Sequence, residues 1–375
     1  MQLTNNTIVP AKLFVSQPPG EPVRVGLLVA KATFKFDVRG RVEIDTQAPL
    51  PLFGQDQETP SGMLPDDAGA RRGELFEVIL LGNAYPPRRP ATATQVALTV
   101  GCERRELMVF GDRVWLGGPP QARISNPAAF DKMPLVYERA FGGTVAANID
   151  RDSVVDFRHP INPRGKGYDA GPQARALCQH LNAPSGFPVF AIEPRPLPNL
   201  ENPSGLIRNW EDAPDPAGWA TVPRDTAIAF MPALRKEEVT IAQVEKNGPV
   251  DPDTYRADME GRTDADPDQA FYRSHPDWRI ARPAAAAPVV LENLLPEAAT
   301  VQFALPQLRV VADYIIDGRQ GKRDMIPQVL VLLPEEKRFY LVFRLPFTFD
   351  PVEAGERAFR LRLQLGWPQA SPRQG

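Results

Sequence analysis

The chain has 375 residues, with 43 Lys and Arg against 46 Asp and Glu, and its net charge of −3 gives no overall basic field for binding nucleic acid or an anionic membrane. Its 42 prolines and 27 glycines follow no period, which excludes collagen, argues against a helical bundle and favours many turns. Hydrophobic residues make up 43% of the chain, enough for a large buried core.

The first 125 residues predict an N-terminal β-rich lobe. Residues 23–37 are rich in β-branched and apolar side chains and end in strict alternation, and a turn then leads into a second alternating strand at 42–45. Residues 55–73 are polar and broken by Pro and Gly, which predicts a long loop. Further strands are predicted at 75–81, 94–102 and 106–116, as in a β-sandwich or barrel.

The remaining chain predicts a loop-rich middle at 126–222 and a C-terminal β-rich lobe at 223–367, followed by a disordered tail at 368–375. One continuous domain is the alternative division. The middle has one expected short helix at 172–181. The expected later strands lie at 227–230, 238–244, 288–291, 301–305, 329–333, 339–345 and 359–365. The predicted fold is therefore mainly β, with sandwich or barrel-like lobes joined by a long Pro/Gly-rich region with few short helices.

The residue patterns indicate neither catalysis nor a bound cofactor. The histidines are dispersed at 159, 180 and 275, the two cysteines at 102 and 178 form no CxxC pair, and no GxSxG occurs. We therefore expect no catalytic residue, no metal and no cofactor. The first residues lack a basic, apolar leader, and no apolar run is long enough to span a bilayer, so a cytoplasmic location is expected.

Three rigid segments of the middle region carry the candidate binding residues. YERAFGG (137–143) predicts a strand that places Arg139 between two aromatic rings, before a double glycine that permits a sharp exit. NPRGKGY (162–168) places two basic residues among glycines, and LPNLENP (197–203) is stiffened by two prolines. For each segment, a packing or turn role stays open beside binding.

We expect 137–143 and 197–203 to approach one another, with Arg139 or another arginine pairing Glu138 or Glu201. Tyr168 and Trp210 are expected to anchor a binding partner, because the sequence does not assign their side chains to a core. The candidate binding residues are Tyr137, Glu138, Arg139, Phe141, Asn162, Arg164, Lys166, Tyr168, Asn199, Glu201 and Trp210. The expected structural turns use Gly142, Gly143, Gly165, Gly167, Pro198 and Pro203.

These three motifs, after GDRVWL (111–116), resemble the bacterial type VI secretion accessory family first catalogued as a domain of unknown function. Four further segments also occur in the chain order that such proteins show: LLVAKATFKFD, LLGNAYPP, DPDQAFYRSHPDWR and a late hairpin ending in LVFRL. The sequence departs from the family pattern after Leu75 and in a shortened TYRADMEGR region.

The resemblance implies a non-catalytic adaptor or chaperone, encoded near spike and PAAR-tip genes. It would act in the donor cytoplasm and load a PAAR-domain or other type VI effector onto the spike trimer. Two alternatives stay open. One is a carbohydrate-active hydrolase on a β scaffold that uses Glu138 and Glu201 as paired carboxylates. The other is a structural component of the secretion apparatus. No nucleic-acid or membrane partner is expected.

Overall fold

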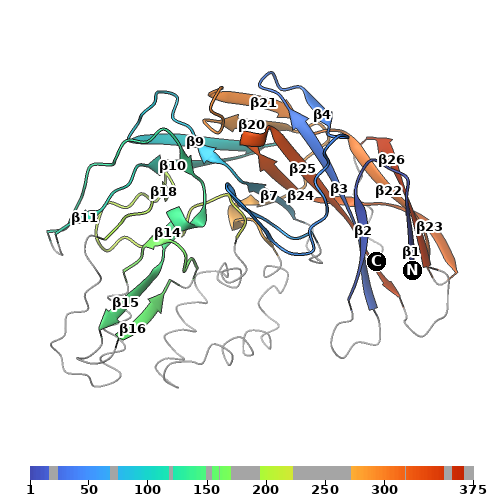
Figure 1. Ribbon diagram of the computed structural model, residues 1–375, viewed down its shortest axis with the longest axis horizontal. Helices are drawn as coiled ribbons and strands as arrows, with labels where there is room; N and C mark the ends of the chain where they lie inside the picture. Colours follow the sequence, from blue (N-terminus) through green and yellow to red (C-terminus); the bar gives the residue numbers. More distant parts are fainter. Residues whose placement is uncertain are drawn as a thin grey trace.

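The structure is a computed structural model, and Figure 1 shows the path of its chain. The predicted mainly β fold is confirmed, because helical structure in the described residues is limited to the single 3₁₀ turns η1 (Tyr137–Arg139), η4 (Pro276–Trp278) and η5 (Pro334–Glu336). No helix in this part of the chain is long and apolar enough to cross a membrane. The described residues are 1–16, 24–67, 75–117, 121–148, 154–159, 161–169, 195–222, 272–316, 318–349 and 357–366.

Four predicted segments lie outside these ranges: the helix at 172–181, the strands at 227–230 and 238–244, and the tail at 368–375.

The central layer is a seven-stranded sheet in the order β19-β7-β24-β25-β3-β2, with β4 also paired to β3. Its pairs are antiparallel except for β7 with β24, which run parallel. Its long strands are the apolar and alternating segments expected from the sequence. The bounds are β2 (Ala11–Ser16), β3 (Arg24–Phe36), β4 (Val42–Ile44), β7 (Phe76–Leu80), β19 (Arg279–Ile280), β24 (Ile326–Leu333) and β25 (Arg338–Phe349).

Two further sheets flank this layer (Figure 1). One has five strands in the order β18-β10-β9-β20-β21: β18 (Leu200–Glu201), β10 (Glu103–Phe110), β9 (Ala93–Val100), β20 (Pro288–Glu292) and β21 (Thr300–Ala304). The other has four strands in the order β1-β26-β22-β23: β1 (Gln2–Asn5), β26 (Arg357–Leu365), β22 (Leu308–Ile316) and β23 (Arg319–Asp324).

Short two-stranded pairs accompany these sheets in the described chain. Within the loop predicted for 55–73, the structure forms the hairpin β5 (Gln57–Thr59) and β6 (Gly62–Leu64), whose tight turn is closed by the Thr59 hydroxyl donating to the Gly62 carbonyl (2.6 Å). Residues 68–73 lie outside the described ranges. The other pairs are β8 (Asn83–Ala84) with β13 (Met133–Pro134), β11 (Trp115–Leu116) with β12 (Arg123–Ile124), β14 (Phe141–Gly142) with β17 (Lys166–Gly167), and β15 (Thr144–Asn148) with β16 (Val154–Arg158).

One hydrophobic core joins the three sheets. Phe339 of β25 stacks on Phe303 of β21 with ring centroids 5.1 Å apart, and Phe36 of β3 stacks on Phe303 at 4.8 Å. Phe347 of β25 contacts Phe359 of β26 at 4.7 Å. Strands from the predicted N-terminal and C-terminal lobes also pair with one another in the same sheets. The predicted lobe boundaries near 125 and 222 stay predictions.

A buried cation fastens the segment before residue 67 to the central sheet. The Lys31 ammonium lies 2.6 Å from Asp67 Oδ2 and donates to the Pro51 carbonyl (2.9 Å). It also faces the rings of Phe53 (4.1 Å) and Tyr340 (4.6 Å). Burial lowers the pKa of Lys31 and raises that of Asp67, and the attraction between the two charges opposes both shifts. This ion pair is fully enclosed by protein.

Candidate functional site

The segment 137–143 is a turn followed by a short strand, which corrects the predicted continuous strand. Arg139 N–H donates to the Val136 carbonyl (3.0 Å) and Ala140 N–H to the Tyr137 carbonyl (3.1 Å), closing η1. Arg139 therefore does not lie between two rings on one strand face. Tyr137 is buried in the main core, and Phe141 is buried in a second, smaller cluster with Trp115, Leu197 and Ile207.

Asn162 connects this turn to the segment 162–168. Its side-chain amide donates to the carbonyls of Tyr137 (2.8 Å) and Phe141 (3.0 Å). Its backbone carbonyl accepts from Gly143 N–H (2.8 Å), and its own N–H donates to His159 Nδ1 (3.0 Å). Asn162 is buried, so its role here is to satisfy backbone groups inside the fold.

Replacing Gly142 by alanine should lower the free energy of unfolding by about 1 to 3 kcal/mol. Gly142 has a φ of +142°, and an added Cβ would lie 2.1 Å from the Asn162 carbonyl oxygen. The matched control is Gly205→Ala, where nothing lies within 4 Å of the added Cβ. Urea denaturation measures both variants, and equal midpoints would contradict this prediction.

The predicted approach of 137–143 to 197–203 is confirmed. Asn199 N–H donates to the Arg139 carbonyl (2.8 Å), and Arg139 Nη1 donates to Asn199 Oδ1 (3.0 Å). Ala140 and Leu200 form a parallel bridge. The Asn199 amide reaches further, to the Phe110 carbonyl (2.9 Å) at the end of β10. The motifs are thus tied to the five-stranded sheet.

The buried charge pair at this junction uses Arg113, which the sequence reasoning did not single out. Arg113 Nη2 donates to Glu201 Oε1 and to the Pro198 carbonyl (2.7 Å), and the two charged side chains are 5% and 1% exposed. Glu201 Oε2 accepts from Ile207 N–H (2.9 Å). The only earlier signal was the position of this arginine within GDRVWL.

Glu138 and Glu201 have different surroundings. Glu138 is 52% exposed, and its carboxylate lies 3.9 Å from Arg164 Nη1. Both oxygens of Glu201 are already hydrogen-bonded in the protein interior. Because Glu201 is buried and paired with Arg113, its carboxylate is not open to a substrate, and these two residues do not form a paired-carboxylate site.

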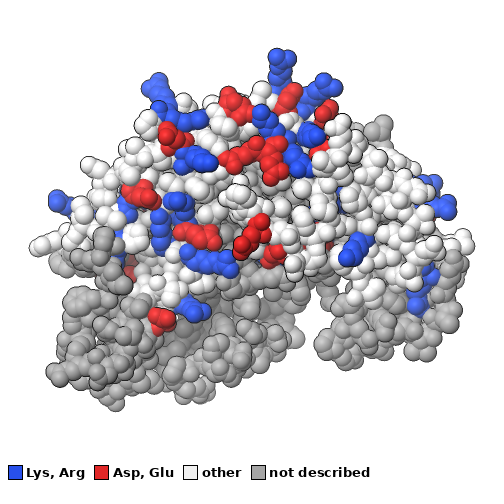
Figure 2. Space-filling view, viewed as in Figure 1, with Lys and Arg blue, Asp and Glu red and all other residues white. Residues whose placement is uncertain are grey.

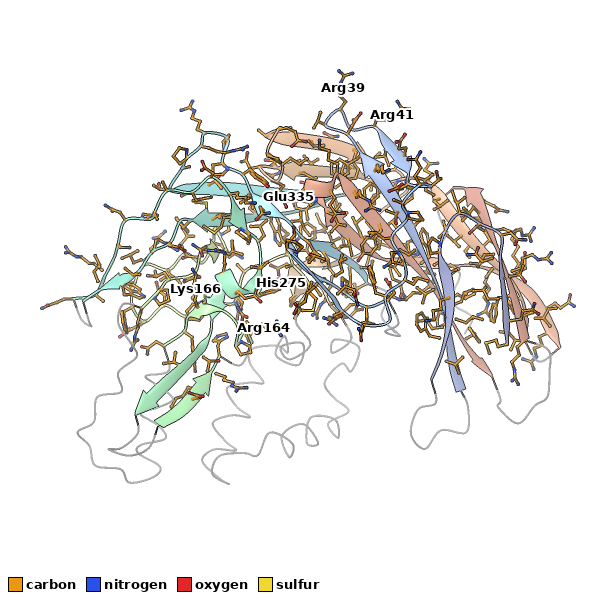
Figure 3. The ribbon with its side chains drawn as sticks, viewed as in Figure 1. Arg39, Arg41, Arg164, Lys166, His275 and Glu335 are labelled. Atoms are coloured by element: carbon orange, nitrogen blue, oxygen red, sulfur yellow. The ribbon has the colours of Figure 1, made fainter. Side chains whose placement is uncertain are left out.

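A second charge cluster lies at the surface of the same junction. Asp112 Oδ1 lies 3.3 Å from Lys166 Nζ and 3.6 Å from Arg139 Nη1, and its side chain is 69% exposed. The hydrogen bond from Asn199, assisted by the Lys166 charge, holds the pKa of Asp112 below its usual value, while burial lowers the pKa of Lys166. Lys166 and Arg164 are labelled in Figure 3.

Replacing Asn199 by alanine should raise the pKa of Asp112 toward 3.8, the value of an unperturbed aspartate. The folded pKa lies below the unfolded one, so stabilisation from this carboxylate is present above the unfolded pKa and lost as the pH falls through the folded pKa. Carbon NMR titration of the carboxyl group measures the shift. Lys166→Met should give a smaller rise, and an unchanged pKa in the Asn199 variant would contradict the assignment.

Trp210 and Tyr168 are packed against neighbouring rings, which corrects the expectation that no core claims them. Trp210 lies 5.2 Å from Trp115, and its indole N–H donates to Asp169 Oδ2 (3.2 Å). Tyr168 contacts the His159 ring edge-on at 5.1 Å, and burial raises the pKa of Tyr168 to about 12. Trp210 packs against the second cluster, and Tyr168 is linked to it through His159, whose ring lies 5.4 Å from that of Phe141.

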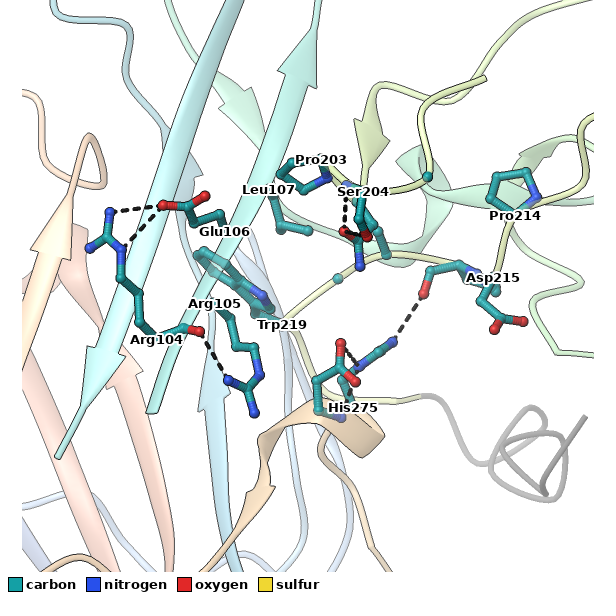
Figure 4. A pocket seen from close by; sticks show the side chains of 16 residues that line it. Arg104, Arg105, Glu106, Leu107, Pro203, Ser204, Pro214, Asp215, Trp219 and His275 are labelled. Carbon is teal, nitrogen blue, oxygen red and sulfur yellow. Dashed lines mark hydrogen bonds and ion pairs between the residues drawn. The ribbon is translucent and has the colours of Figure 1, made fainter. Parts of the chain in front are cut away.

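An open groove lies beside this junction (Figure 4). Its volume is about 650 Å³, and Pro203 of the LPNLENP motif is among its lining residues. Figure 4 shows residues of β10 on one side and Pro214 and Asp215 on the other. The further lining residues are Arg104, Arg105, Glu106, Leu107, Asn202, Ser204, Gly205, Pro216, Ala217, Gly218, Trp219, His275 and Asp277.

His275 is held in a fixed orientation at the end of this groove. Its Nδ1 accepts from Asp277 N–H (3.2 Å), which caps η4 and places the ring proton on Nε2, and Nε2 donates to the Pro216 carbonyl (3.1 Å). Burial lowers the pKa of His275, so the ring is neutral at neutral pH. The histidine joins two walls of the groove.

A protein-family model described as "Uncharacterized protein conserved in bacteria (DUF2169)" matches residues 21–344. No curated protein and no solved structure matches the chain.

Proposed function

Because the chain belongs to this DUF2169 family of bacterial proteins, we propose that it is a non-catalytic adaptor or chaperone of type VI secretion. It binds a PAAR-bearing effector or tip protein in the cytoplasm of the donor cell and assists its loading onto the spike. The type VI role comes from the ordered motifs of the middle region, and the binding role from the surface beside them.

The observation that carries the binding role is the open groove of about 650 Å³ next to Pro203. The motif segments around it are fastened by internal bonds, such as those of Asn162 and Asn199. A surface held in one conformation before binding loses little entropy when a partner docks. An adaptor interface of roughly 1,200 to 2,000 Å² would extend beyond the groove onto the surrounding surface.

The charge pattern of the surface is consistent with a protein partner. On the face shown in Figure 2, basic and acidic side chains are interspersed, and no large field of one sign dominates that face. Recognition of a protein by such a face depends on shape and on individual charges rather than on long-range attraction. The exposed Asp112 and the partly buried Lys166 supply charges of both signs at the junction.

Deletion of the gene tests the proposal when effector abundance and effector export are measured separately. We expect one or both to fall for a PAAR-bearing effector of the same organism, while export of an unrelated effector by the same apparatus continues. Co-expression should also yield a stable complex of the two proteins. Normal abundance and export, together with turnover of a carbohydrate by the purified protein, would replace the adaptor with the hydrolase.

A further inference from the structure

In the part of the chain that the structure describes, one edge of the strand β10 is only partly paired. β10 pairs along its whole length with β9 on one side, from Glu103 to Phe110. On the other side, β18 pairs only with Met108 and Val109. Within the described residues, no strand pairs with Glu103 to Leu107 on that side, so half of β10 borders the groove without a neighbouring strand.

The ladder fixes which backbone groups face the groove. In an antiparallel pair, alternate residues direct both their N–H and C=O groups toward the same neighbour. Phe110 N–H donates to the Asn199 carbonyl, away from β9. By the same alternation, the backbone groups of Arg104 and Glu106 also face away from β9, and both residues line the groove.

A side chain occupies part of this edge in the structure. Arg105 Nη1 donates to the Arg104 carbonyl (2.9 Å), as the dashed line in Figure 4 shows. The guanidinium thus takes the position that a strand N–H would take in a paired sheet. Such cover is a common way to shield an open edge from unwanted pairing, and it can be displaced when a correct partner arrives.

The charges of the groove define the chemistry of the partner. On the β10 wall, Arg105 pairs with Glu103 (2.9 Å), and Arg104 pairs with Glu106 (3.0 Å) and with Glu292. The exposed carboxylate of Asp215 lies on the side away from β10. The exposed carboxylate of Asp277 lies 3.5 Å from His275 Nδ1. The floor is apolar, with Leu107 and Trp219.

We propose that an extended segment of the partner polypeptide adds to β10 as a further strand, bonding to the backbone of Arg104 and Glu106. An apolar side chain of that segment faces Leu107 and Trp219, and a Lys or Arg side chain reaches Asp215. Main-chain hydrogen bonds supply affinity in this mode, and the side-chain contacts supply specificity. The inference rests on the proposed adaptor function and locates its binding surface.

The test is co-purification and affinity measurement of the 375-residue chain with a PAAR-bearing effector from the same organism. Glu106→Pro removes an N–H that faces the groove and leaves the ladder to β9 intact, because Glu106 and Ala97 form a pair without mutual hydrogen bonds. The matched control is Ala304→Pro on β21, at the opposite edge of the same sheet. Asp215→Lys reverses the charge without altering any strand.

We expect Glu106→Pro and Asp215→Lys each to weaken binding by about tenfold or more, and Ala304→Pro to leave it unchanged. Hydrogen exchange at the Arg104 and Glu106 amides should slow when the effector is added. Full binding by Asp215→Lys, or amides that are equally protected with and without effector, overturns the β10 site while the adaptor function stands. No binding by the unaltered protein overturns both. Asp215 lies in an exposed loop, so Asp215→Lys should fold and can test the β10 site even if Glu106→Pro does not fold.

Discussion

Replacing Arg113 by methionine should lower the free energy of unfolding by about 3 to 5 kcal/mol. The methionine fills much of the arginine volume but leaves the carboxylate of Glu201 buried without a counter-charge. The Pro198 carbonyl also loses its donor. Chemical denaturation measures the effect.

Arg139→Ala is the control for this prediction. Arg139 bonds to Asn199 and lies near Asp112, whose side chain is 69% exposed, so its loss leaves no buried charge. A cost of about 1 to 2 kcal/mol is expected, because the ion pair with Asp112 is exposed but the buried Asn199 Oδ1 loses a donor. The double variant Arg113→Met with Glu201→Leu should recover much of the loss, because it removes both charges together. Equal costs for the two arginine variants would show that the charge of Glu201 is not what Arg113 stabilises.

Replacing Lys31 by methionine should destabilise the protein by about 3 kcal/mol or more. The variant keeps an unbranched side chain between Phe53 and Tyr340 but leaves Asp67 without the ammonium at 2.6 Å. The Pro51 carbonyl loses a donor as well. Because these contacts fasten the segment to the sheet, hydrogen exchange should accelerate at Phe53 N–H, which donates to Asp67 Oδ2 (2.7 Å).

Lys35→Met is the matched comparison, because Lys35 lies on the same strand and pairs with Asp45 at 3.0 Å while its side chain is 42% exposed. Asp45 is itself buried, but it keeps Arg338 Nη2 at 3.2 Å when Lys35 is replaced. The loss of Lys35 should therefore cost less than the loss of Lys31. Unchanged exchange at Phe53 in the Lys31 variant would mean that other contacts hold the segment.

Strands could be predicted from the sequence wherever apolar and polar residues alternate within a single segment. Residues 23–37 and 359–365 became β3 and β26, and the turn at 334–337 joins β24 to β25 as expected. Each of these signals lies within one strand or hairpin, where side-chain period and turn residues act directly. The neighbours of a strand carry no such local signal, and the parallel pair of β7 with β24 was not anticipated.

The candidate site was predicted only in outline. Two rigid motifs were expected to meet, and the bonds between Arg139 and Asn199 join them. Glu201 pairs with an arginine, as expected, but the sequence did not show that this arginine is Arg113. The two residues lie 88 positions apart, and no local pattern selects one arginine over another. The sequence predicts a strand where the structure has the turn at 137–139. The side chain of Asn162, from a distant segment, donates to the Tyr137 carbonyl, and no sequence pattern near Tyr137 indicates that bond.

The pairing of β3 with β25 has a consequence for synthesis on the ribosome. These strands come from opposite ends of the chain, and β1 near the N-terminus pairs with β26 near the C-terminus. A growing chain therefore exposes β3 with one side unpaired until residues 338–349 of β25 have been made. Folding that depends on contacts between distant parts of the sequence is slow, and the unpaired edge of β3 can aggregate in the meantime. A truncated product ending before β24 would lack the middle of the central sheet and should be degraded rather than accumulate.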